Sequence, residues 1–230
     1  MKTQQQNSEK IKEISKYRLW LNKKGDAKYL SHHDVILLLQ QAIRKADLPV
    51  TLYGDYNPRM KMSFHTSVAV GVSCEGEPVD IVFFEDIGSE LLVEKLKKKL
   101  PSGMEIVKAE KILPTKLKYF LKIFYYIEVS QFIAPEKSLE LMSSSNLFIN
   151  RYKENTTKKI DIRPYLLECK IENPNLECSA IYVVTTMGTQ GSVSVWEILE
   201  LLGIPKESKP SIAITRTLVE LVPHIEIKPS

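Results

Sequence analysis

The spacing of apolar and polar residues predicts strands and helices in a regular order. Residues 17–22 alternate between apolar and polar side chains, which is the pattern of a half-buried strand. Apolar residues recur every three or four positions over residues 35–46 and every four positions over residues 92–100, so both stretches predict amphipathic helices. Further strands are predicted at residues 63–72, 79–84 and 104–112, with a turn at 74–78 and a short additional strand at 50–53.

A second half repeats this order. Residues 119–129 alternate as a long strand, and a short helix is predicted over residues 135–142. Ser194 and Glu197 have the spacing of a capping box, so another helix is predicted to begin there. The remaining strands are predicted at residues 160–171, 178–186 and 211–221. Pro164 should force a bulge or an edge position in the first of these three.

Both halves therefore have the predicted order β-α-β-β-α-β, in which two helices cover one face of an antiparallel sheet. We predict an α+β protein built from two tandem ferredoxin-like units with antiparallel sheets. The expected organisation is a flexible tail at residues 1–15, an N-terminal unit at 16–114 and a C-terminal unit at 115–230.

Composition and charge narrow the class of protein. With 43% hydrophobic and 26% charged residues, the 230-residue chain has the composition of a globular protein. No apolar run approaches the length of a membrane span, and the polar residues 1–15 do not resemble a secretion signal, so we expect a cytoplasmic protein. The formal net charge of +4 is compatible with an anionic partner.

The cysteines and histidines do not predict a metal centre. Cys74, Cys169 and Cys178 are an odd, widely spaced set, which favours neither a disulfide framework nor a Cys-x-x-Cys metal site. The chain also lacks a Cys-x-x-x-Cys-x-x-Cys triplet for an iron–sulfur cluster. A zinc site formed by His32 and His33 with His65 would have no cysteine partner and unsuitable spacing. We therefore predict no cofactor and no metal in this chain.

The polar residues with the most regular placement lie between residues 29 and 80. Ser31 and Asp34 have capping-box spacing at the start of the first predicted helix, with His32 and His33 between them in its first turn. A polar loop, residues 54–61, follows the helix. The candidate residues for binding an anion or RNA are Arg44, Asn57, Arg59 and Lys61.

Several ordered motifs carry a resemblance to a known family. These are K-x-G, Y-L-S-H-H-D, A-I-R-K-A-D-L-P-V, Y-N-P-R-M-K-x-S-F and G-V-S-C-E-G-E. Together they resemble the radical-SAM-linked protein family, a domain of unknown function found beside or fused to a radical S-adenosylmethionine protein. The resemblance extends over nearly everything after residue 16. The chain departs from the family at His33, where leucine is usual, and at Arg59 and Met60, where histidine and proline are usual.

The resemblance implies a radical SAM protein as partner, with S-adenosylmethionine and the iron–sulfur cluster held by that partner. One hypothesis is a noncatalytic RNA-associated adaptor that presents a substrate to this partner. A second is a metal-independent endoribonuclease or RNA-modification subunit, in which neutral His32 or His33 acts as the base and Lys61 or Arg59 stabilises the phosphate. A third is a protein-only scaffold in which loop 54–61 is the partner interface. Tyr126, or its neighbour Tyr125, could also offer a stacking surface for a base.

Overall fold

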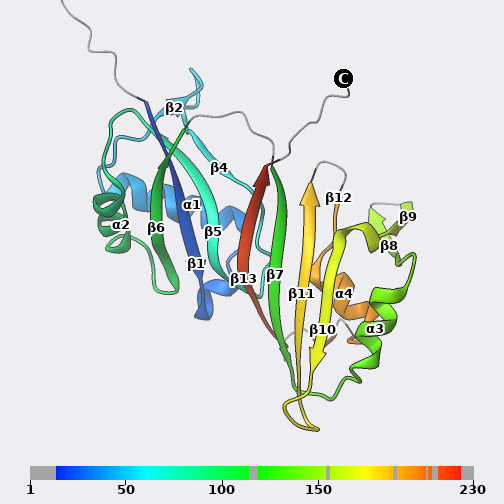
Figure 1. Cartoon of the computed structure of the whole chain (residues 1–230). Helices are drawn as coiled ribbons and strands as arrows, with labels where there is room; N and C mark the ends of the chain where they lie inside the picture. The colour runs from blue at the N-terminus through cyan, green and yellow to red at the C-terminus, as the bar shows by residue number, and fades with distance from the viewer. Residues whose placement is uncertain are drawn as a thin grey trace, which may run out of the picture.

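The computed structural model describes residues 14–113, 119–153, 156–188, 191–205, 207–208 and 212–223. These residues form one nine-stranded sheet, two small two-stranded sheets and four α-helices. The path through the large sheet is β10-β11-β7-β13-β5-β1-β6, with β4 beside β5 and β12 beside β11 (Figure 1). The predicted α+β class is confirmed.

In the N-terminal half, the central strand is β1. It pairs antiparallel with β5 on one side and with β6 on the other, and β4 pairs antiparallel with β5. The large-sheet strands and helices of this half are β1 (Ser15–Lys23), α1 (His32–Lys45), β4 (Met62–Phe64), β5 (Val72–Phe83), α2 (Ser89–Lys97) and β6 (Met104–Ile112). A 3-10 helix at Gly25–Tyr29 and a hairpin of β2 (Leu52–Tyr53) and β3 (Arg59–Met60) complete it.

The C-terminal half is centred on β7, which pairs antiparallel with β11 and with β13. Its elements are β7 (Tyr119–Val129), α3 (Glu136–Ser143), β8 (Phe148–Lys153), β9 (Thr156–Asp161), a 3-10 helix (Arg163–Tyr165), β10 (Leu166–Glu172), β11 (Ser179–Gly188), β12 (Gly191–Ser192), α4 (Val195–Leu201) and β13 (Ile212–Pro223). Strands β8 and β9 form a hairpin outside the large sheet.

The two halves share one sheet because β13 pairs in parallel with β5. Ile214 to Arg216 of β13 lie beside Val72 to Cys74 of β5. The sequence predicted two antiparallel sheets, and this part of the prediction is wrong: the parallel pair makes a single mixed sheet. The pairing joins segments about 140 residues apart, which local periodicity does not report.

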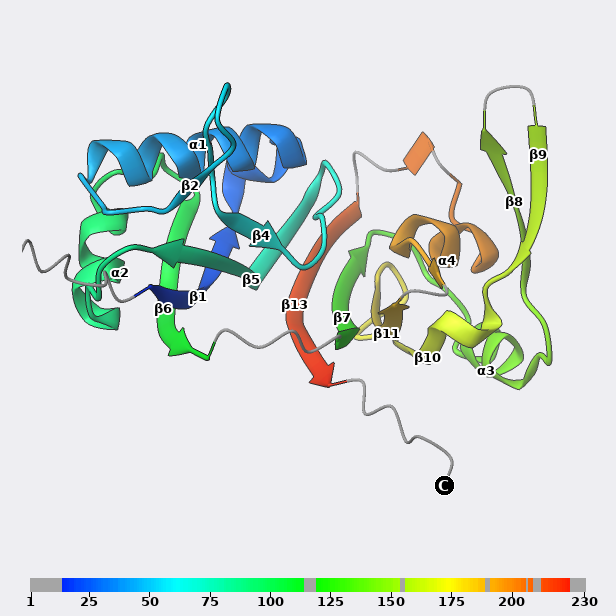
Figure 2. The ribbon, with the colours of Figure 1, turned by 90° about the horizontal axis from the view of Figure 1, so that it is seen from above.

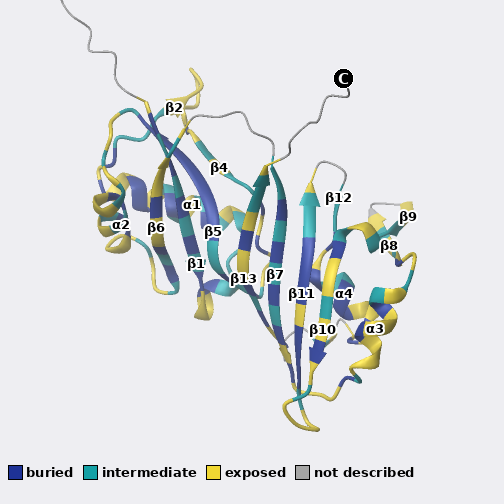
Figure 3. Ribbon diagram, viewed as in Figure 1, coloured by how far each residue is buried: buried dark blue, intermediate teal, exposed yellow. Residues whose placement is uncertain are grey.

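The helices pack on one face of the sheet, and α1 and α4 lie on the same side in Figure 2. The strands alternate between the helix-covered face and the opposite, uncovered face. Tyr17, Leu19 and Leu21 of β1 are at most 1% exposed and pack with α1 and α2, whereas Arg18 and Trp20 are half-buried on the uncovered face. Figure 3 shows this burial along the central strands. A second apolar cluster fills the C-terminal half.

The predicted turn at residues 74–78 is wrong, because β5 runs unbroken from Val72 to Phe83. Gly76 has φ +69°, a left-handed conformation open to glycine, and sits where the pairing with β1 is irregular. The backbone can therefore bend within the strand instead of turning. The strand predicted at residues 63–72 is correspondingly short, since β4 ends at Phe64 and a loop follows.

Residues 153–159 show no apolar pattern in the sequence, yet their described backbone belongs to the β8–β9 hairpin. The side chains of Lys158 and Lys159 are exposed. The strand predicted at residues 160–171 is divided by the 3-10 helix that contains Pro164. Proline has no backbone N–H to give to a ladder, which explains why the strand stops there.

The two predicted capping boxes are confirmed. Ser31 and Asp34 form a reciprocal capping box at α1, and Ser194 and Glu197 form another at α4. The predicted boundary near residue 115 and residues 1–13 of the predicted tail lie outside the described residues, so the division into units stays a prediction. No helix in the described ranges is long and apolar enough to cross a membrane.

Candidate functional site

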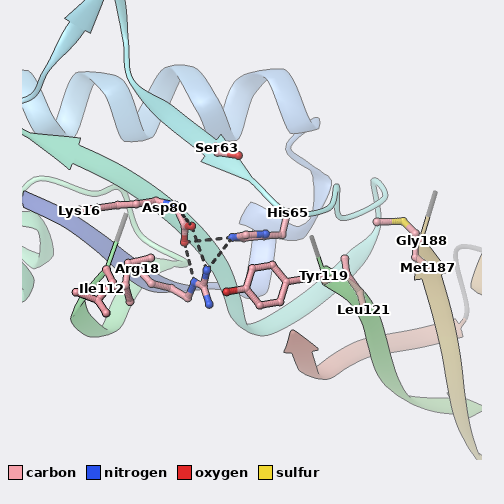
Figure 4. Close-up of a pocket in the computed structure, with 11 residues that line it drawn as sticks. Lys16, Arg18, Ser63, His65, Asp80, Ile112, Tyr119, Leu121, Met187 and Gly188 are labelled. Atoms are coloured by element: carbon pink, nitrogen blue, oxygen red, sulfur yellow. Dashed lines mark hydrogen bonds and ion pairs between the residues drawn. The ribbon is translucent and has the colours of Figure 1, made fainter. Parts of the chain in front are cut away.

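A cavity of about 670 Å³ opens where β5 and β13 separate, and we call it the fork pocket. The two strands pair over only three residues, and farther along its length β5 pairs with β4 instead. The cavity lies in this gap, between the two halves of the protein (Figure 4). Its polar lining consists of Lys16, Arg18, Ser63, His65, Asp80 and Tyr119, and its apolar lining includes Ile112, Leu121 and Met187.

Asp80 is the centre of the polar lining. Strand pairing places it opposite Arg18 of β1, and the residue is only 3% exposed. Arg18 donates from Nε to Oδ1 at 2.7 Å and from Nη2 to Oδ2 at 3.0 Å. Lys16 Nζ lies 2.8 Å from Oδ2, and His65 Nε2 lies 3.1 Å from Oδ1. Both carboxylate oxygens therefore have cationic or imidazole partners.

These contacts control the protonation of Asp80. Burial alone would raise the pKa of the carboxyl, but hydrogen bonds from His65, Arg18 and Lys16 outweigh it and hold the pKa well below its usual range. Asp80 is thus a carboxylate at neutral pH. Its geometry fixes the position of the Arg18 guanidinium and of the His65 ring.

Tyr119 forms the aromatic wall of the fork pocket. The Arg18 guanidinium lies 5.5 Å from the centre of its ring, and the His65 ring meets it edge-on at 6.2 Å. Lys16 and Arg18 carry two positive charges against the single negative charge of Asp80. The pocket therefore combines an excess of positive charge with planar groups that can stack, a combination suited to an anionic ligand that contains a ring.

The two histidines of the Ser31–Asp34 motif lie elsewhere. His32 is half-buried, and its ring meets the Phe64 ring edge-on at 5.0 Å. Burial lowers the pKa of His32, and the nearby Lys23 lowers it further. This direction agrees with the neutral state expected from the sequence, although burial rather than the helix terminus is the main cause. His33 is exposed.

Arg44, Asn57, Arg59 and Lys61 are all exposed. Arg44 follows His32 by twelve residues in α1, which corresponds to about 18 Å along the helix. Asn57 lies in the turn of the β2–β3 hairpin, Arg59 lies in β3, and the Lys61 backbone bonds to Thr51 and Val82. Among the contacts of the described residues, none joins either histidine to Arg59 or Lys61. The structure therefore does not assemble these candidates around the histidines, and their role in binding stays a prediction.

The residues of the fork pocket were missed by sequence reasoning, apart from His65, which entered only as a rejected zinc ligand. One signal was present: Asp80 stands between Val79 and Ile81 in an apolar strand. A carboxylate in such a run needs a partner when it is buried. The sequence pattern does not reveal that the partners come from β1 and from the loop after β4. Within the described residues no group of three or more His, Cys, Asp or Glu side chains could hold a metal ion.

The fold and the pocket define an α+β protein with a polar cavity at the junction of two halves. Comparison with protein families matches residues 16–195 to the family described as "uncharacterized protein conserved in bacteria" (DUF2344), and the chain belongs to this family. Its association with radical SAM proteins stays a prediction.

No curated protein matches the sequence. Among solved structures, the chain is similar to one in the "Crystal Structure of a Cbf5-Nop10-Gar1 Complex", with 9% sequence identity and a TM-score of 0.48. The match covers 88% of this chain and 48% of that chain, so this protein spans about half the length of its structural neighbour.

Proposed function

We propose that this protein is a noncatalytic RNA-associated module that holds a nucleotide of a single-stranded RNA in the fork pocket and presents it to a partner protein. The observation that carries the proposal is the arrangement of Lys16, Arg18 and Tyr119 around a cavity of about 670 Å³. Cavities of this size are typical of small-molecule sites. Aromatic rings and arginine planes stack on bases, while lysine pairs with phosphate.

The noncatalytic part of the proposal rests on Asp80. A general base must have a free lone pair and a pKa near the working pH. The Asp80 carboxylate instead contacts Arg18, Lys16 and His65, and its pKa is well below the usual range. We interpret Asp80 as a positioning residue that orients Arg18 toward Tyr119.

The proposed partner is a radical SAM protein, which would hold the S-adenosylmethionine and the iron–sulfur cluster. Support comes from the resemblance carried by the Y-L-S-H-H-D and Y-N-P-R-M-K-x-S-F motifs. We further interpret each half as a ferredoxin-like unit. The pairing orders β4-β5-β1-β6 and β10-β11-β7-β13 support this interpretation, because both match the order of that arrangement.

Fluorescence anisotropy with a labelled twelve-nucleotide single-stranded RNA tests the proposal. Tyr119→Ala should weaken binding about tenfold or more, because base stacking on an aromatic ring contributes about 1–3 kcal/mol. Tyr29→Ala is the matched control, since Tyr29 is 59% exposed and has Lys28 above its ring at 5.0 Å but does not line the fork pocket. Equal binding by the two variants, or no binding by the wild type, would overturn the proposal.

A further inference from the structure

A second cavity of about 320 Å³ lies next to the fork pocket, and we call it the seam cavity. The loop after β4 separates the two: His65 lines the fork pocket, and the next residues, Thr66 and Ser67, line the seam cavity. Ala69 and Val72 of the N-terminal half also line it, and the C-terminal half supplies the other lining residues, including Tyr125 of β7 and Arg216 of β13. Both halves of the protein therefore contribute to this cavity.

The charges around the seam cavity are already matched. Arg151 donates to both carboxylate oxygens of Glu197, at 2.7 and 2.8 Å. Arg216 donates to Glu77 at 2.9 Å and also to the Tyr125 hydroxyl at 3.1 Å. Each guanidinium thus has its own carboxylate, in contrast to the excess positive charge of the fork pocket. An uncharged ligand group fits this electrostatic environment better than an anion or a cation does.

The rest of the lining combines apolar residues with residues that carry hydroxyl groups. The apolar residues are Ala69, Val72, Ile123, Met187, Val193 and Val195, and the hydroxyl groups belong to Thr66, Ser67, Ser192 and Ser194. Arg216 is 4% exposed, and its Nε has no acceptor among the described residues. Such a lining suits a ring with polar edges, such as a nucleobase or a ribose.

The two cavities are close enough for one ligand to occupy both. Met187 lines each of them, and its Sδ lies 3.9 Å from Thr66 Oγ1. On β7, Leu121 lines the fork pocket and Ile123 lines the seam cavity, which places the two linings about 7 Å apart along the strand. Methionine is unbranched and flexible. The Met187 side chain lies between the two cavities and can change its conformation to accommodate a ligand that spans both.

We infer that the seam cavity is a second subsite for the same RNA, taking the base or ribose next to the nucleotide in the fork pocket. The inference rests on the proposed function and extends it. The ligand is at least a dinucleotide, with its anionic part beside Lys16 and Arg18 and an uncharged ring beyond Met187.

Calorimetry with uridine 5′-monophosphate and 5′-phosphorylated diuridylate, repeated with the adenosine pair, tests the inference. The wild type should bind the dinucleotide about tenfold more tightly or better. Ser67→Tyr should reduce that advantage to less than about threefold and leave mononucleotide binding unchanged, because the new ring fills the seam cavity. The Ser67 carbonyl that accepts from Arg216 at 3.0 Å belongs to the backbone and is retained. Ser145→Tyr, at an exposed position outside both cavities, is the control.

The outcomes separate the subsite from the proposed function. Two outcomes would overturn the second subsite without contradicting the proposed function of the fork pocket. In the first, the wild type binds the mononucleotide and the dinucleotide equally tightly. In the second, Ser67→Tyr still binds the dinucleotide more tightly by the same factor as the wild type. No binding of either nucleotide to the wild type overturns both. If Ser67→Tyr does not fold by circular dichroism, Ala69→Tyr fills the same cavity from another exposed position and carries the same expectation.

Discussion

Arg216 of β13 and Glu77 of β5 form an ion pair across the seam between the two halves, with Nη1 and Oε2 2.9 Å apart. Their side chains are only 5% and 3% exposed. The pair adjoins the short parallel ladder in which Arg216 lies beside Cys74. A buried charge pair therefore reinforces the contact that makes one sheet from two halves.

Removing one partner of this pair should destabilise the protein strongly. Arg216→Met leaves Glu77 buried without its cation, and we expect the free energy of unfolding to fall by about 3–5 kcal/mol in urea denaturation. The double variant Arg216→Met, Glu77→Leu should recover part of the loss, since neither member of the pair is left buried alone. Lys98→Met breaks an exposed pair with Glu94 and should cost less than about 1 kcal/mol. Equal effects of the two single variants would contradict the structural role of Arg216.

The Asp80 cluster should make stability depend on pH in the acidic range. The folded-state pKa of Asp80 lies below the unfolded value of about 3.9, so the unfolded chain binds more protons as the pH falls. The stabilisation is therefore complete at pH values above about 5 and is lost progressively below about pH 4. Asp80→Asn should be less stable than the wild type at pH 7 and lose less stability between about pH 4 and pH 2.

Urea denaturation at several pH values measures both effects. Asp55→Asn removes an exposed carboxylate in the β2–β3 hairpin and should leave the pH dependence close to that of the wild type. If Asp80→Asn follows the wild-type pH dependence, its contacts with Arg18, Lys16 and His65 do not stabilise the fold.

Local periodicity predicted the helices well because packing uses the same residues. Val35, Leu39 and Ile43 of α1 form the apolar stripe expected from the sequence, and all three are buried. The capping residues were equally informative, since Ser31 and Asp34 interact within one turn. Features whose cause lies within a few residues could thus be predicted.

The junction and the pocket could not be predicted in this way. Arg216 and Glu77 are 139 residues apart, and Arg18 and Asp80 are 62 apart. Which strands lie side by side depends on how the whole chain folds, and periodicity identifies only the face to which a residue belongs. The sequence pattern therefore favoured the polar loop 54–61 as the binding region. The charged residues that cluster in the structure, Lys16, Arg18 and Asp80, lie on strands whose sequence pattern does not reveal that they meet.

We still expect the β2–β3 hairpin to contribute to RNA binding. Arg59 and Lys61 are exposed, so phosphate contacts would be electrostatic and independent of sequence. The double variant Arg59→Ala, Lys61→Ala should weaken binding to several single-stranded RNAs to a similar extent. Removing two phosphate contacts should also reduce the slope of log K against log salt by about 1.4.

The double variant Lys97→Ala, Lys99→Ala is the control, because it lowers the net charge by the same amount at positions on and just after α2. If both pairs have the same effect, the hairpin has no specific role in RNA binding.

His32 and His33 allow the noncatalytic proposal to be tested against the endoribonuclease alternative with a matched pair of variants. His32 packs edge-on against Phe64 at 5.0 Å, so His32→Ala should cost about 0.5–1.5 kcal/mol of stability, whereas His33→Ala at its exposed position should cost less than about 0.5 kcal/mol. Neither change should alter the amount of RNA bound at a temperature where both variants are folded. Metal-free incubation with labelled RNA, resolved on denaturing gels, should show no cleavage by the wild type or by either variant. Cleavage by the wild type that His32→Ala or His33→Ala abolishes, with RNA still bound, would make the protein an enzyme and refute the noncatalytic proposal.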